Sequence, residues 1–163
     1  MLTLPRIVER QATHYAAVAA EVRIPFGDAI GPRMDAAAGY LDGAGVKDFG
    51  PALFKYDVID MPRLEMQFGF VTPAPVAGND SVKPGVLLAG KYVNVTYVGP
   101  YEDLEQATAV VIGWARLVGV EWDSTGGPDG ERFASRFEIY NNGPMDEPDP
   151  NKFETEIWIK AKG

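Results

Sequence analysis

Hydrophobic and polar positions follow an order that the chain runs through twice. Residues 13–23 and 90–99 alternate with the period of a β-strand, and a run with helical spacing follows each of them, over about 26–42 and 101–117. Two further alternating runs come after each helix, at 51–59 and 64–71 in the first half and at 132–140 and 153–161 in the second. The pattern therefore predicts two units of strand, helix, strand and strand.

The ends of the two predicted helices support a duplication. Four pairs of residues match there: Gly39 with Gly113, Tyr40 with Trp114, Gly45 with Gly119, and Val46 with Val120. The second glycine of each unit stands where a helix end favours a residue at positive φ. We expect a single α+β domain of duplicated units with antiparallel sheets, related by a pseudo-twofold axis with a cleft between them. Repeat one covers about 5–72, a linker rich in proline and glycine about 73–83, and repeat two about 84–161.

Composition excludes several kinds of site. The 163 residues contain no cysteine and one histidine, so thiolate chemistry and paired-histidine metal sites are ruled out, and we expect neither a metal nor a cofactor. A net charge of −8 argues against direct binding of nucleic acid. No apolar run is long enough to span a bilayer, and the N-terminus does not read as a signal peptide. We therefore expect a cytoplasmic protein that does not bind membranes.

One segment imitates a nucleotide-binding loop. Gly85 to Lys91 has the glycine spacing and the lysine of a phosphate-binding loop, but Tyr92 stands where serine or threonine would hold magnesium. The lysine also opens a strand, whereas a phosphate loop opens a helix whose N–H groups meet the anion. Residues 123–130 similarly imitate a calcium loop, but they lack the alternate acidic residues and predict a turn.

The last two predicted strands carry polar side chains on one face. Alternation places Arg136, Glu138 and Tyr140 together, and it groups Glu156 with Trp158 on the following strand. We expect the apolar rows of both strands to meet the helices, which leaves these second rows for the cleft or for solvent. Carboxylates beside aromatic rings suit an organic cation, since the cation pairs the buried charge and the rings attract it. Solvated glutamates on an outer sheet face are the alternative.

Several of these runs resemble the second half of GyrI-like small-molecule-binding domains, which are also the effector-binding domains of AraC-type and multidrug-responsive regulators. The resemblance rests on GKYVNVTYVGPYEDLEQA (90–107), on RFEIYNNGP (136–144) and on TEIWIKA (155–161), together with the helix-end Trp114. The first half matches only in pattern. The repeated unit is similar to the paired SHS2 modules of that family, and no segment resembles a DNA-binding reader.

The resemblance implies a cleft for hydrophobic, often cationic, compounds with an acidic residue at its centre. Glu138 is the position that matches this carboxylate, and Glu156 matches a second acidic position of the motif. Aromatic walls are expected from six residues of both repeats and from one neighbour of Glu138: Phe68, Phe70, Tyr92, Tyr101, Trp114, Trp158 and Tyr140.

Three functions stay open at this point. The first is a stand-alone module that captures a hydrophobic or cationic drug or toxin. The second is a hydrolase of cyclopropanoid-type compounds, in which Glu138 activates water and Tyr92 or Tyr140 acts as the acid. The third, suggested by the family's name, is a protein-binding inhibitor of DNA gyrase. The sequence does not decide between binding and turnover.

Overall fold

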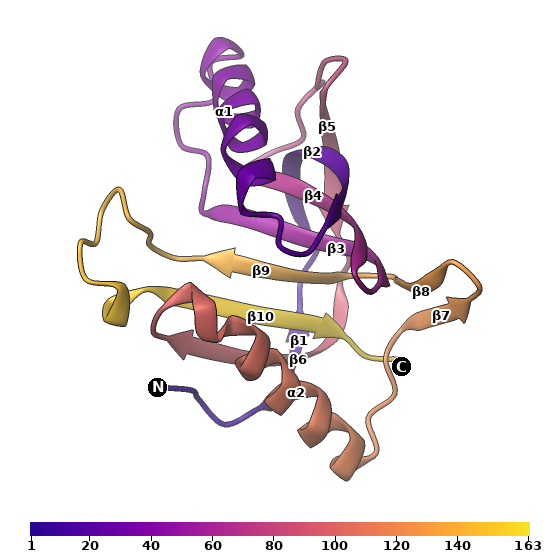
Figure 1. The fold of residues 1–163 in the computed structure, drawn as a ribbon. Helices are drawn as coiled ribbons and strands as arrows, with labels where there is room; N and C mark the ends of the chain where they lie inside the picture. The colour runs from indigo at the N-terminus through magenta and orange to yellow at the C-terminus, as the bar shows by residue number, and fades with distance from the viewer.

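A computed structural model describes all 163 residues and shows a ten-stranded antiparallel sheet with two α-helices (Figure 1). The first half contains β1 (Arg6–Arg10), β2 (Thr13–Arg23), α1 (Gly27–Gly43), β3 (Ala52–Asp60) and β4 (Arg63–Val71). The second half contains β5 (Val82–Leu87), β6 (Gly90–Val98), α2 (Leu104–Val118), β7 (Ser124–Gly127), β8 (Gly130–Phe133), β9 (Arg136–Tyr140) and β10 (Glu154–Lys160). Short 3₁₀ helices at Tyr101–Asp103 and Pro150–Lys152 precede α2 and β10. The predicted α+β class is confirmed.

The strand order has internal symmetry. Along the sheet it is β1-β6-β10-β9-β3-β4-β2-β5, and β7 and β8 form a hairpin beside β3. If β1, β2, β3 and β4 are exchanged with β5, β6, β9 and β10 respectively, the new order is the same order read from the opposite end of the sheet. This is the symmetry of a twofold axis between β3 and β9. The first strand of each half also pairs with a strand of the other half: β1 pairs with β6, and β5 pairs with β2. The repeat boundaries themselves stay a prediction.

The sequence pattern misses three strands, β1, β5 and β7, the last of which lies within residues 123–130 that were expected as a turn. β1 is short and mostly polar, and β5 contains Pro84 and Gly85, which sheet edges tolerate because one side of an edge strand needs no ladder hydrogen bonds. The chain expected as one strand over 132–140 is divided into β8 and β9 at Ala134 and Ser135. β8 leaves the line of the sheet to pair with β7 around a turn at Pro128 and Asp129.

The two helices lie close to their predicted positions. α2 buries Leu104, Ala107, Val111 and Ala115, whose spacing of three and four residues places them on one face of the helix. α1 buries only Ala37 and Leu41. The glycines expected at the helix ends both have positive φ, 77° at Gly45 and 78° at Gly119. Neither helix is long and apolar enough to cross a membrane.

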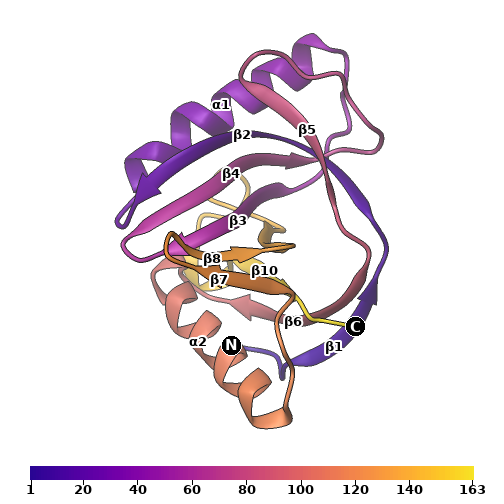
Figure 2. The ribbon, with the colours of Figure 1, turned by 90° about the vertical axis from the view of Figure 1, so that its right-hand side faces the viewer.

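The sheet curls strongly (Figure 2), and its two faces pack against different parts of the molecule. α1 packs on β2 and β4, and α2 packs on β6, so both helices cover the same face. The opposite face closes on itself around a core of eight buried residues: Tyr15, Ala17, Leu53, Leu87, Tyr92, Phe137, Ile139 and Trp158. The central strands β3 and β9 are joined by only four residue pairs, and they lie where the two helix-covered halves meet.

Candidate functional site

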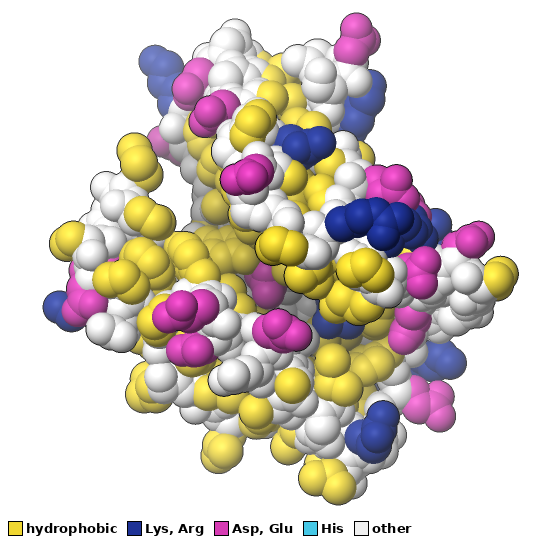
Figure 3. Space-filling model, in the orientation of Figure 1, with side chains coloured by type: hydrophobic (Ala, Val, Ile, Leu, Met, Phe, Trp, Pro, Cys, Tyr) yellow, Lys and Arg dark blue, Asp and Glu magenta, His cyan; other side chains and the backbone are white.

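A cavity of about 1000 Å³ lies between the two helices, over the central strands β3 and β9. Of its 31 lining residues 19 are hydrophobic, so the walls are mainly apolar. Figure 3 shows the face of the molecule that is hollowed here, with hydrophobic side chains around the opening. The cavity therefore stands at the junction of the two halves, which is a common position for small-molecule sites.

Each wall of the cavity comes from a different part of the chain. The segment that leads into α1 and the first two turns of that helix contribute Ile24, Phe26, Ile30 and Met34. The start of α2 contributes Leu104, Glu105, Thr108 and Ile112. The floor comes from Phe54 and Tyr56 of β3 and from Arg136, Glu138 and Tyr140 of β9. Residues 141–146, in the loop after β9, complete the rim.

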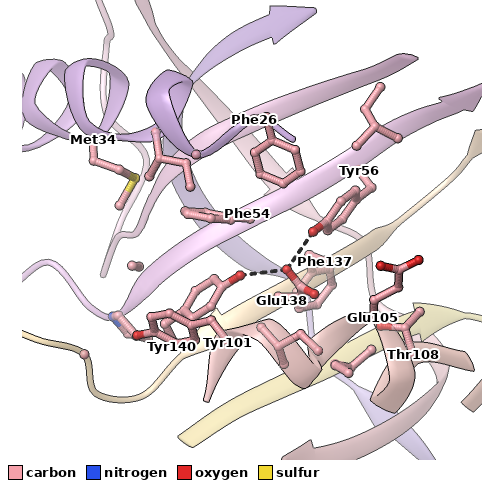
Figure 4. Close-up of a pocket in the computed structure, with 18 of the residues that line it drawn as sticks. Phe26, Met34, Phe54, Tyr56, Tyr101, Glu105, Thr108, Phe137, Glu138 and Tyr140 are labelled. Carbon is pink, nitrogen blue, oxygen red and sulfur yellow. Dashed lines mark hydrogen bonds between the residues drawn. The ribbon is translucent and has the colours of Figure 1, made fainter. Parts of the chain in front are cut away.

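Glu138 is the buried carboxylate of this floor. It is 6% exposed, and it lies opposite Phe54 in the register of β9 with β3. The hydroxyls of Tyr56 and Tyr140 donate hydrogen bonds to the same carboxylate oxygen, Oε1, at 2.8 and 2.7 Å (Figure 4). The other oxygen, Oε2, accepts no hydrogen bond from the protein, yet it is not sealed from accessible space. Glu138 thus presents one unpaired oxygen to the cavity.

The surroundings of Glu138 act on its charge in opposite directions. Burial raises the pKa of the carboxyl above its usual value, while the hydrogen bonds from Tyr140 and Tyr56 and the nearby Arg136 guanidinium lower it. Burial and the Glu138 carboxylate raise the pKa of both tyrosines well above 10.0. The tyrosines therefore stay protonated and remain hydrogen-bond donors, whereas Glu138 carries a carboxyl that is easier to protonate than usual.

Three further charged groups line the cavity. Glu105 at the start of α2 and Asp146 on the rim loop are acidic and lie at exposed positions. Arg136, on the floor, is partly buried and is the only basic residue among the lining residues. Figure 4 shows Glu105 and Thr108 projecting from α2 towards the region of Glu138. With Glu138, the cavity holds three acidic groups and one basic group.

Four of the nine residues proposed from the sequence line this cavity. They are Glu138, Tyr140, Tyr101 and Phe70, which come from both repeats. The rings of Tyr101 and Tyr140 meet edge to face with centroids 5.6 Å apart, so these two side chains form one continuous wall. Whether the four residues bind a ligand stays a prediction.

The other five residues lie elsewhere. Tyr92 and Trp158 belong to the core on the opposite face of the sheet, and Glu156 accepts hydrogen bonds from Trp158 and Asn141. Trp114 packs on the apolar cluster beneath α2, and Phe68 is fully buried below Phe26 and Phe54. None of the five lines the cavity. Tyr92 also cannot act on Glu138 from its position, since its hydroxyl hydrogen-bonds Leu88 and Ser135.

The expectation that the apolar rows of both late strands meet the helices was half wrong. Ile157 and Ile159 of β10 do pack with residues of α2. On β9, however, the side chains of Phe137 and Ile139 pack in the core of the opposite face, although Phe137 also borders the cavity, and the polar row with Glu138 faces the helices. The reason lies in the curled sheet, whose far face encloses a second core that needs its own apolar row.

Sequence reasoning also missed residues of the first repeat and of α2. Tyr56 is the principal omission, since it donates to Glu138 as Tyr140 does. Alternation along residues 51–59 places Phe54 and Tyr56 on one face, which is a signal that could have found them. No group of histidine, cysteine, aspartate and glutamate side chains is clustered closely enough to hold a metal ion.

Comparisons with known proteins agree with this picture of the fold. A family model described as the GyrI-like small molecule binding domain matches residues 4–162, and no curated protein matches. The C-terminal domain of EcmrR superposes with a TM-score of 0.74 at 15% identity, over 98% of this chain and 97% of that one. In the EcmrR–DNA complex the match has a TM-score of 0.73 and 15% identity and covers 98% of this chain but only 57% of the EcmrR chain.

Two other solved structures have ligands or activities in their names. SAV2435, solved bound to tetraphenylphosphonium, has a TM-score of 0.59 at 15% identity over 99% of this chain and 95% of that one. A hydrolase from Listeria innocua has a TM-score of 0.62 at 15% identity over 97% of this chain and 91% of that one. At these identities the likeness shows the fold.

Proposed function

Because the chain belongs to the GyrI-like small-molecule-binding domain family, we propose that it captures amphipathic organic cations in the cavity, with Glu138 as their counter-ion. The one observation that carries the proposal is the unpaired Oε2 of a buried carboxylate inside an apolar cavity. A buried charge without a partner is costly, and a cation that enters the cavity supplies the partner. A ligand therefore gains from the charge only if it carries the opposite one.

Aromatic rings around Glu138 add to this selectivity. Phe54 packs on Tyr140 with ring centroids 4.7 Å apart, and Tyr56 and Tyr101 line the same cavity. Each ring face within reach of a cation contributes roughly 0.5–2 kcal/mol, more when water is excluded. The volume of about 1000 Å³ accommodates a multi-ring organic molecule. Among proteins of similar fold, SAV2435 has been solved with an organic cation, tetraphenylphosphonium.

The test compares tetraphenylphosphonium with neutral triphenylphosphine oxide on the wild type and on Glu138→Gln. Unit charges about 5 Å apart interact by roughly 3 kcal/mol at an effective dielectric constant of 20. We therefore expect the substitution to weaken tetraphenylphosphonium about tenfold or more and to leave the neutral compound within about twofold. Titration calorimetry measures both dissociation constants.

Glu156→Gln is the matched control, because it removes the same charge from the opposite face of the sheet. It should change neither affinity. An equal loss for both compounds in Glu138→Gln would mean that Glu138 only shapes the cavity. No loss for either compound would leave the proposal without support.

A second candidate function is hydrolysis of cyclopropanoid compounds, which is favoured by the tyrosine hydroxyls that hydrogen-bond Glu138. Glu138 would take a proton from water, whose oxygen attacks a carbon of the strained ring. The ring C–C bond then breaks, its electron pair moves through the conjugated system onto the oxygen of a carbonyl group of the compound, and Tyr140 or Tyr56 protonates that oxygen. Tyr140 was the acid proposed from the sequence, and Tyr56 takes the place suggested for Tyr92.

Mass spectrometry distinguishes the two candidates. Hydrolysis adds the mass of one water molecule to a cyclopropanoid compound, and Glu138→Gln should abolish this product. Dose-dependent thermal stabilisation of the protein without any product would support capture alone. The interpretation as a DNA gyrase inhibitor has no support from the cavity or from the relatives.

A further inference from the structure

We propose that the cavity has a second recognition point, the Arg136 guanidinium, which binds an acidic group of the ligand. The preferred ligands are then amphipathic zwitterions, with a cationic centre for Glu138 and an anionic group for Arg136. The inference rests on the proposed function, because it concerns the second charge of the same cavity. It restricts the class of ligand further than Glu138 does alone.

Arg136 has no polar partner in the protein. Its guanidinium lies over the rings of Phe133 and Tyr56, at 4.7 and 5.9 Å from their centroids, and it forms neither a hydrogen bond nor a salt bridge. None of its nitrogen atoms is fully buried, and the residue lines the cavity. The five N–H donors of this side chain are therefore available to a ligand.

Other arginines show what a satisfied guanidinium looks like in this chain. Arg63 bonds the carboxylates of Glu21, Asp60 and Glu65 at 3.0, 3.4 and 2.8 Å. Arg136 is partly buried like Arg63, but its guanidinium lies over two aromatic rings and forms no hydrogen bond or salt bridge. Burial lowers the pKa of Arg136 from its usual value, and the nearby Tyr56, Glu138 and Glu131, none of which forms a hydrogen bond or salt bridge with it, offset this only in part.

Glu138 does not pair with Arg136, although both side chains lie on the same face of β9. Neighbours on one face of a strand are two residues, or about 6–7 Å, apart along the chain. The carboxylate is instead held by Tyr56 and Tyr140, and Tyr56 stands between the two charges, bonded to one and beneath the other. The cavity thus presents a free carboxylate oxygen and a free guanidinium side by side.

This arrangement favours a zwitterion over a simple cation. A cation that binds Glu138 is also repelled by Arg136, and it leaves the guanidinium unpaired. A ligand that adds a sulfonate or carboxylate a few ångströms from its cationic centre removes the repulsion and gains charge-assisted hydrogen bonds. Arginine forms these bonds in pairs with planar or tetrahedral oxyanions, which fixes the orientation of the ligand.

Two surfactant-like probes test the idea. Decyltrimethylammonium is a cation, and decyldimethyl(3-sulfopropyl)ammonium carries the same chain and ammonium with a permanently ionised sulfonate three carbons away. Calorimetry below their micelle concentrations gives the ratio of the two dissociation constants for each protein. In Arg136→Met we expect this ratio to shift against the zwitterion by about tenfold or more, while decyltrimethylammonium binds equally well or more tightly.

Matched variants keep the result interpretable. Arg132→Met removes an exposed arginine from β8, outside the cavity, and should leave the ratio unchanged. Arg136→Gln serves if the methionine variant does not fold, and thermal unfolding checks both. A ratio that is the same in the wild type and in either folded Arg136 variant overturns the inference. If decyltrimethylammonium fails to bind the wild type, the proposed function fails as well, whereas loss of its binding in Glu138→Gln supports that function independently.

Discussion

The two faces of β9 bear different kinds of residue although they belong to one strand of five residues. On one face the side chains of Phe137 and Ile139 pack in a buried core with Tyr92 and Trp158. On the other face Glu138 and its neighbour Arg136 meet a cavity and leave polar groups without protein partners. Adjacent residues therefore stabilise the core in the first case and, in the proposed function, meet the ligand in the second.

The difference shows how a fold tolerates an unfavourable site. A carboxylate with one unpaired oxygen costs folding free energy, and this cost must be offset elsewhere. The face directly behind Glu138 provides that compensation, since the rings of Phe137 and Tyr92 pack edge to face with centroids 5.6 Å apart. Changes to the two faces should consequently have separable effects.

The largest effect is expected from Phe137→Ala. The side chain is fully buried, and its removal leaves a cavity in the far core that the neighbours fill only partly. We expect a loss of about 3–5 kcal/mol in the free energy of unfolding, measured by chemical denaturation. Met145→Ala, at a residue that is 98% exposed on the cavity rim, should stay within about 0.5 kcal/mol. A loss below about 1 kcal/mol in Phe137→Ala would contradict the role of this core.

The next effect is a pH dependence that belongs to the other face. Because burial raises the pKa of Glu138 above 4.5, the carboxylate protonates at a higher pH than an exposed glutamate does. A cation gains from the ionised form, so its affinity should fall as pH decreases through this raised pKa, towards the affinity that Glu138→Gln retains. Tetraphenylphosphonium titrations between pH 7.5 and 4 measure the fall, and Glu138→Gln should remove it.

The contribution of Glu138 to protein stability should depend on pH in the opposite direction to its contribution to affinity. A carboxyl with a raised pKa in the folded state binds a proton more tightly there than in the unfolded chain, so its contribution becomes less favourable as pH rises from 4.5 through the raised value. The stability of ligand-free Glu138→Gln, taken relative to that of the ligand-free wild type, should therefore be higher at neutral pH than at pH 4. If the Glu138 carboxylate instead made the wild type more stable than Glu138→Gln at neutral pH, the conclusion that one of its oxygens has no partner would be wrong.

Sequence patterns predicted the two-repeat order and several site residues for physical reasons. Alternation correctly groups Arg136 with Glu138 and Ile157 with Ile159, because side chains of a strand point to opposite faces in turn. The choice of Glu138 came from resemblance, since one glutamate in a strand does not reveal its surroundings. The structure places Glu138 in the cavity, and its part in binding stays a prediction.

The rest depended on tertiary structure that alternation cannot supply. Both faces of β9 are covered, so a periodic pattern gives two rows without telling which row meets a cavity. Trp158 and Tyr92 looked like aromatic walls, but the curled sheet encloses them behind Glu138. Tyr56 reaches Glu138 from 82 residues away through the pairing of β3 with β9, and only the register of these two strands brings them together.

The smallest effect is expected when a tyrosine is replaced by phenylalanine. The same substitution on the two faces of the sheet should have different results. Tyr140→Phe removes a hydrogen bond that lowers the pKa of Glu138, so the carboxyl should protonate at a still higher pH. We expect the midpoint of the pH dependence of tetraphenylphosphonium binding to move upward, by an amount that corresponds to about 0.5–1.5 kcal/mol for one hydrogen bond. The affinity at a pH well above this midpoint should change less, because the carboxylate is ionised there in both proteins.

Tyr92→Phe is the matched control for this last shift. The Tyr92 hydroxyl is bonded to Leu88 and Ser135 in the far core, so its loss leaves a buried partner unsatisfied and lowers stability by about 1–3 kcal/mol. It makes no contact with Glu138, and the midpoint for ligand binding should not move. If Tyr92→Phe moved the midpoint as far as Tyr140→Phe, the two faces of the sheet would be coupled, and their separate contributions to stability and recognition would have to be abandoned.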